Sequence, residues 1–97
     1  MDIVELTSKI RVMFEELVAE VEHSNVRGKW LNKRDLMVHK AEGRVMFEIL
    51  TTAWSGDPHK METAIQLGQR LETAISKSAA RHAAKFKKTD NSVSSES

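Results

Sequence analysis

The sequence predicts an all-α protein, and three observations support that fold class. Apolar residues recur at steps of three and four along two long stretches, which is the pattern of amphipathic helices. The chain has 97 residues with only 4 Gly and 1 Pro, so it offers few turns. The breaks between its helical stretches are short, and short connections place consecutive helices in an antiparallel hairpin. We therefore expect one domain, built from a helical hairpin and a third helix.

The first predicted helix runs from about Asp2 to His23, with Glu and Lys residues on its polar face. The segment Ser24–Gly28 should end it, because Asn and Gly both tolerate the left-handed conformation found at helix ends. The apolar side of this helix consists of Ile3, Leu6, Ile10, Met13, Phe14, Leu17, Val18 and Val21.

The second predicted helix begins near Trp30–Lys33 and continues to Trp54. Gly43 lies inside it and costs about 1 kcal/mol relative to Ala. This cost predicts that another part of the structure approaches the backbone closely at Gly43. Trp30 and Trp54 flank the helix, and we expect both to anchor the core or an interface between subunits.

The third predicted helix follows the clearest break in the chain. Gly56 is suited to end the second helix, Asp57 to cap the third and Pro58 to occupy its first position. The helix should continue to Lys88, which makes residues 1–88 the folded domain. The Ser-rich segment 89–97 has little to bury, and we expect a disordered tail there.

The net charge of +1 hides an uneven distribution. Residues 1–23 contain six acids and two bases, whereas residues 24–56 contain three acids and six bases. Residues 57–88 contain three acids and seven bases, and the tail contains two acids. An acidic front and a basic rear favour a polyanionic partner.

The composition also argues against several classes of protein. With no Cys there is no disulfide framework and no thiolate zinc site. No stretch approaches the roughly 18 apolar residues of a membrane span, and the start of the chain lacks the order of a signal peptide. We expect a soluble cytosolic or nuclear protein without membrane binding. A chain this small is marginally stable alone, which favours a homodimer.

A row of bases is predicted along the second helix. At 100° per residue, Lys29, Lys40 and Arg44 fall within about 40° of Lys33, and Thr51 shares the direction of Lys33. The row from Lys29 to Arg44 would span about 22 Å. A solvated polar face would explain it, but such faces usually mix charges and this row contains no acid. The apolar row on the opposite side consists of Leu31, Val38, Val45, Ile49 and Ala53.

The chemistry of the basic row suits a phosphate backbone better than base edges. Its side chains are Lys and Arg with one Thr, and no Asn or Gln is placed to read bases. A-form RNA presents a wide, shallow minor groove flanked by phosphates, across which a flat helical face can lie. A symmetric dimer would set two rows side by side. We therefore predict sequence-independent binding of double-stranded RNA.

Three short motifs follow one another along residues 3–52. They are Ile3–Ile10, Asn25–Arg27, and His39–Ala41 followed by Val45, Ile49 and Thr51–Thr52. Their order and spacing resemble the first helix, the inter-helix turn and the second helix of the nodavirus RNA-silencing suppressors, the small "B-two" proteins. The resemblance implies a homodimer whose long helices form an antiparallel four-helix bundle with one face along double-stranded RNA. It also implies a viral non-structural protein in the host cytoplasm, which shields long duplexes from Dicer and keeps short ones from the silencing complex.

The resemblance also assigns individual residues, and it leaves direct contact with Dicer open. Lys40 matches the family's central RNA-contacting Lys, Arg27 the base of the turn and Lys9 the base on the first helix. Phe47 stands where the family has a second base, for which Arg44, one turn earlier, can substitute. The long basic third helix is another departure. The predicted RNA-contacting residues are Lys40, Arg44, Lys33, Lys29, Arg27, Lys9 and Thr51.

No catalytic or metal site is predicted, and no cofactor. The chain lacks a Cys nucleophile, a phosphate-cradling Gly loop and a metalloprotease helix motif. A di-iron bundle needs two Glu-x-x-His motifs with further inward Glu residues, so we interpret the His–carboxylate pairs as surface pairs. These pairs are Glu20/His23, His39/Glu42 and His59/Glu62.

Two alternatives stay open. The late part of the third helix forms a solubilising face, an RNA contact or an interaction arm; membrane binding is disfavoured because its apolar side is mostly Ala. The whole chain is alternatively a helical adaptor or regulator from a phage or plasmid, which docks a protein partner and has no RNA role. The bases of the late third helix are Lys77, Arg81, Lys85 and Lys88.

Overall fold

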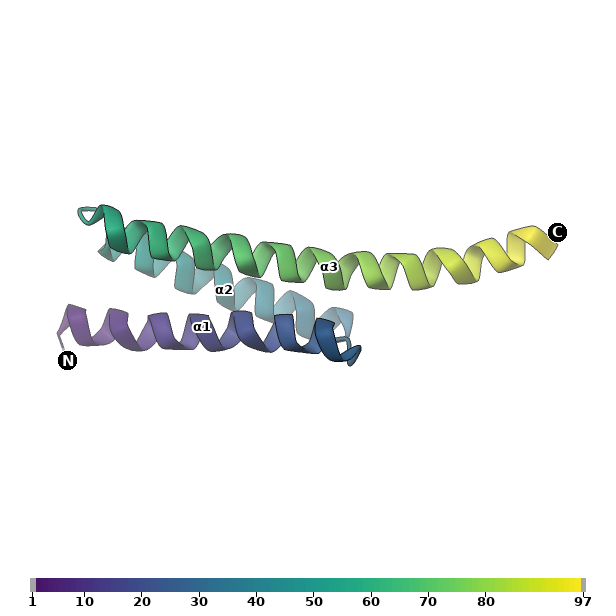
Figure 1. The fold of residues 1–97 in the computed structure, drawn as a ribbon, viewed down its shortest axis with the longest axis horizontal. Helices are drawn as coiled ribbons and strands as arrows, with labels where there is room; N and C mark the ends of the chain where they lie inside the picture. The colour runs from purple at the N-terminus through teal and green to yellow at the C-terminus, as the bar shows by residue number, and fades with distance from the viewer. Residues whose placement is uncertain (1, 97) are drawn as a thin grey trace.

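The computed structural model describes residues 2–96, with side chains through Ala84, and contains three helices and no strand in that range. Helix α1 spans Ile3–Arg27, α2 spans Lys33–Ala53 and α3 spans Pro58–Glu96. The first two form an antiparallel hairpin, and α3 packs along both before extending past the hairpin loop (Figure 1). The all-α prediction is confirmed.

Each helix begins at a side chain that satisfies free backbone amides. The Oδ1 atoms of Asp2 and Asn32 accept hydrogen bonds from the third amide beyond them, both at 2.8 Å. Asp57 Oδ1 accepts from His59 N at 3.0 Å and from Lys60 N at 3.2 Å. The predicted cap at Asp57 is therefore confirmed, and caps of this kind contribute about 1 kcal/mol each.

Helix α1 is longer than predicted. It was expected to end near His23, but residues 24–27 continue the helix and only Gly28 leaves it, with φ at 72°. Two polar side chains in this last turn find partners that keep the helix intact. Ser24 Oγ donates to Val21 O at 2.8 Å, and Asn25 Nδ2 donates to Ala74 O on α3 at 2.8 Å. Contacts with α3 therefore override the local preference of Ser and Asn for a turn.

One apolar core lies between the three helices. Trp54 belongs to this core, as predicted, and lies at the turn between α2 and α3. Gly43 is buried where α2 meets α3, and a Cβ atom there would lie 2.1 Å from Leu71 Cδ2, which confirms the predicted close approach. The apolar side chains that are buried most completely are Phe14, Val18, Val21, Leu50 and Ala64.

The buried face of α2 is not the apolar row opposite the bases. That row was expected to be the inner side, but Val38, Val45 and Ile49 are between 39% and 55% exposed. The buried face lies about 80° from the basic row, which makes it a neighbour of the bases. Helix α2 carries two apolar rows, and the pattern alone does not say which one α1 and α3 cover. The residues buried in α2 are Leu36, Gly43, Met46 and Leu50.

Helix α3 also runs further than predicted. It was expected to end at Lys88, and its helical backbone continues to Glu96. Side chains beyond Ala84 lie outside the described residues. The division into a domain at 1–88 and a disordered tail at 89–97 stays a prediction.

Candidate nucleic-acid interface

A groove between α2 and α3 gathers three of the predicted RNA-contacting residues. Lys40 and Arg44 border a part of about 450 Å³, whose α3 wall includes Gly68, Glu72 and Ser76. Lys33 and Lys40 border a second part of about 500 Å³, whose α3 wall includes Ile75, Ala79 and His82. Lys40 belongs to both parts, so it occupies the middle of the groove.

Helical geometry places these bases at the rim of the groove. Lys33 is the first residue of α2, and Arg44 follows Lys40 by one turn. The helical part of the row therefore spans about 16 Å, shorter than the predicted 22 Å. The basic row lies beside the buried face of α2, so its side chains emerge next to the seam with α3. Long Lys and Arg side chains can lay their stems along apolar surface while their charged ends stay in water.

The charges of the row are mostly available to a partner. Arg44 Nε lies 3.8 Å from Glu48 Oε1, with side chains 82% and 69% exposed. A pair so exposed contributes about 0–1 kcal/mol and is easily exchanged. Within residues 2–84, Lys33 and Lys40 form no ion pair. The one acid lining this groove is Glu72, an exposed residue of α3.

The remaining predicted residues lie outside this groove. Arg27 is in the last turn of α1, and Lys29 is in the connection before α2, so the helical wheel does not apply to Lys29. Lys9 is exposed on α1. Thr51 is half-buried, and its hydroxyl lies 2.8 Å from Phe47 O and 3.3 Å from Glu48 O of its own helix. Its hydroxyl hydrogen is therefore used, which leaves Thr51 as an acceptor and not as a donor to phosphate.

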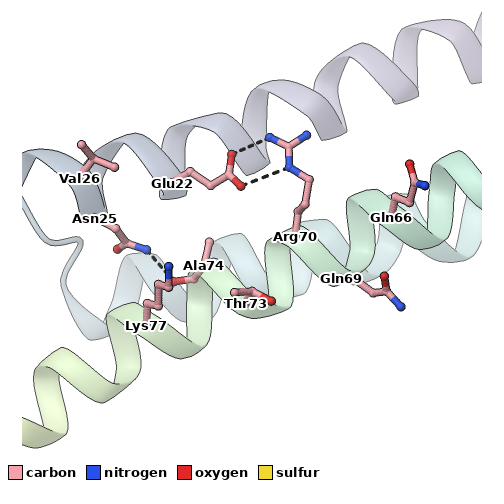
Figure 2. Close-up of a pocket in the computed structure, with 9 residues that line it drawn as sticks. All are labelled: Glu22, Asn25, Val26, Gln66, Gln69, Arg70, Thr73, Ala74 and Lys77. Carbon is pink, nitrogen blue, oxygen red and sulfur yellow. Dashed lines mark hydrogen bonds and ion pairs between the residues drawn. The ribbon is translucent and has the colours of Figure 1, made fainter.

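A second groove, between α1 and α3, has a different chemistry. It has a volume of about 690 Å³, and seven of its nine lining residues are polar or charged (Figure 2). Arg70 Nη2 donates to Glu22 Oε1 at 2.6 Å, and Arg70 Nε donates to Glu22 Oε2 at 3.2 Å. The hydrogen bonds that Arg70 donates to Glu22 raise the pKa of Arg70, and its charge is already paired. Bidentate pairing gives this contact a defined geometry.

Sequence reasoning missed the contribution of α3 to both grooves. Residues of α3 wall each groove, and two bases of the same helix, Lys77 and Arg81, are exposed near the hairpin loop. Their spacing of four residues was visible in the sequence. Their position beside the α1–α2 loop was not, because it depends on how α3 packs on the hairpin.

Neither a metal cluster nor a membrane span is found in the described part of the chain. No group of three or more His, Asp or Glu residues there could hold a metal ion. His39 Nε2 instead lies 3.2 Å from Glu20 Oε2 across the α1–α2 seam. None of the described helices is both long and apolar enough to cross a membrane.

No known protein family, curated protein or solved structure matches the chain.

Proposed function

We propose that this chain binds double-stranded RNA without regard to sequence. The observation that carries the proposal is the row of exposed bases along the α2–α3 groove, where Lys33 and Lys40 lack an acidic partner within residues 2–84. No Asn or Gln of α2 accompanies them to read base edges. Phosphate contacts of this kind position a protein on a duplex and carry no sequence information.

We further propose that two copies form the binding unit. Apolar residues are exposed on both α1 and α2, the helices that the resemblance assigns to a four-helix bundle. Val45 on α2 and Met13 on α1 are more than half exposed, and Leu6, Val38 and Ile49 are at least 39% exposed. Exposed apolar surface of this extent favours a protein interface, because its burial is worth about 25 cal/mol per Å².

The biological role follows from the resemblance to the nodavirus suppressors. Two of the three motifs lie in the helices that the resemblance assigns to them, Ile3–Ile10 in α1 and His39–Ala41 in α2. The third, Asn25–Arg27, was expected in the turn between the helices and is instead the last turn of α1. The proposed role is suppression of RNA silencing in a host cytoplasm, by shielding long duplexes from Dicer and short duplexes from the silencing complex.

Binding of the purified chain to three nucleic acids tests this function. Duplex RNA, duplex DNA and single-stranded RNA of equal length are compared by gel shift at one salt concentration. Duplex RNA should bind most tightly, and its affinity should fall steeply with salt as counterions are released. Equal binding of all three, or an affinity that does not change with salt, would contradict the proposal.

Lys40→Ala tests the assignment of the groove. The variant should bind duplex RNA about 25-fold more weakly at 0.15 M salt, because each of the two copies loses one phosphate contact worth about fivefold. Lys60→Ala is the matched control, because Lys60 is exposed in the first turn of α3 and lines neither groove. Both variants should keep wild-type helicity. An unchanged affinity for Lys40→Ala would show that RNA binds elsewhere.

The exposed apolar residues favour a second candidate, a helical adaptor that docks a protein partner. Sedimentation of the isolated chain separates the two functions. A dimer that buries these residues supports the RNA-binding unit. A monomer that binds no duplex RNA supports the adaptor.

A further inference from the structure

Two bases of α3 take no part in the ion pairs described above. Lys77 and Arg81 are four residues apart, so they share one side of the helix, and both are exposed. The guanidinium carbon of Arg81 lies 5.6 Å from the centre of the Trp30 ring. A cation–π contact of this kind orients the guanidinium without cancelling its charge. Within residues 2–84, neither base forms an ion pair.

The part of α3 that carries these bases is fixed to the hairpin loop. His82 Nε2 lies 2.6 Å from Leu31 O in the connection between α1 and α2. Asn25 Nδ2 donates to Ala74 O at 2.8 Å, and Ser78 Oγ donates to Asn25 Oδ1. Because contacts from Ala74 to His82 hold this segment, Lys77 and Arg81 project from a preorganised surface.

Basic side chains therefore lie on both sides of α3. Lys77 lines the α1–α3 groove beside Asn25 and Ala74 (Figure 2), whereas Lys33 and Lys40 lie across the α2–α3 groove. Between the two sets, the outward face is exposed and small, and the one acid beside it is Glu72, at the edge of the α2–α3 groove. A helix with its side chains is about 10–12 Å across, which sets the approximate separation of the two rows. The residues of the outward face are Thr73, Ser76, Ala80 and Ala84.

We infer that α3 supplies the second half of the RNA contact surface. The duplex lies along the outward face of α3, with Lys33 and Lys40 on the phosphates of one strand. Lys77 and Arg81 contact the phosphates of the other strand. The wide, shallow minor groove of A-form RNA accepts such a face, and small uncharged residues let the backbones approach closely. This inference rests on the proposed function, which names the ligand but places its contacts on α2.

Arg70 is a base of the same helix that differs from Lys77 and Arg81 because it is paired. It lies about two turns before Lys77 and three before Arg81 on nearly the same side of α3, but its guanidinium is held by Glu22 at 2.6 Å. Arg70 therefore belongs to the packing of α1 on α3, and we exclude it from the RNA surface.

The test is duplex RNA binding by Lys77→Ala and by the double variant Lys77→Ala/Arg81→Ala. Each lost phosphate contact should lower affinity about fivefold at 0.15 M salt, and each substitution removes one contact from both copies, so Lys77→Ala should bind about 25-fold more weakly. The slope of log affinity against log salt should fall by about 2 for the single variant and about 4 for the double. Lys60→Ala on the same helix is the control and should change neither quantity.

The outcomes separate this inference from the proposed function. If the Lys77 and Arg81 variants bind duplex RNA like the wild type while Lys40→Ala binds weakly, α3 is not part of the surface and the function stands. If the wild type shows no preference for duplex RNA, both fail. Arg81→Ala also removes the contact with Trp30, so helicity is measured for the double variant. The single Lys77→Ala variant decides the question if the double variant unfolds.

Discussion

The two sides of α3 meet their neighbours by different means. Toward α1, hydrogen bonds between side chains or with the backbone join the two helices. Arg70 bonds to Glu22, and Asn25 bonds to Ala74 and Ser78. Toward α2, the helices meet by close packing around Gly43. On the first side, the charges of Arg70 and Glu22 are paired within the fold. Charges on the second side, at Lys33 and Lys40, are left at the rim.

This difference shows where to look for a partner. A base that orients one helix on another is neutralised, and its removal should affect stability more than binding. A base beside an apolar seam contributes little to packing through its charge, so it is available to an external anion.

Gly43→Leu should loosen the close-packed side. A Cβ atom at Gly43 would lie 2.1 Å from Leu71 Cδ2, so the larger side chain forces α2 and α3 apart. Overpacking of this kind should lower the free energy of unfolding by about 1–3 kcal/mol. Denaturant unfolding followed by circular dichroism measures it. Gly56→Leu is the control, because a Cβ atom at Gly56 meets nothing within 4 Å. Equal losses in both variants would contradict a specific role for Gly43.

Asn25→Ala should weaken the polar side. Ser78 is fully buried and donates to the Asn25 side chain, so the substitution leaves its hydroxyl without that acceptor. The expected loss is about 1–2 kcal/mol in the free energy of unfolding. Gln69→Ala, an exposed neighbour in the same groove, should cost almost nothing. If the two variants lose the same stability, the polar contacts do not hold α3 in place.

Glu22→Gln should release Arg70 from its ion pair within the fold and make its charge available to RNA. The pair is about half exposed, so its loss should cost less than about 1 kcal/mol of stability. The released guanidinium lies on the helix that carries Lys77, and the salt slope of duplex RNA binding should steepen by about 2, one for each copy. Glu42→Gln makes the same change of charge on the far side of α2 from the basic row. An identical gain in both variants would mean that only net charge matters.

The candidate site was only partly predictable from the sequence. Lys33, Lys40 and Arg44 were found because α2 is regular and a 100° step places them on one side. Lys29 was placed on the same row in error, since α2 begins only at Lys33. Lys77 and Arg81 were seen as a periodic pair, but the pattern alone did not connect them to the hairpin loop.

The sequence alone determined the helices and their starts. The three-to-four periodicity marks α1 and α2, and Asp57 followed by Pro58 marks the first residue of α3, because these signals depend on neighbours along the chain. The tertiary structure decided which faces are covered. Leu50 is buried while Ile49 is 39% exposed, and α1 continues through Asn25 because α3 accepts its hydrogen bond. Burial and long-range bonds depend on helix packing, which a periodic pattern does not contain.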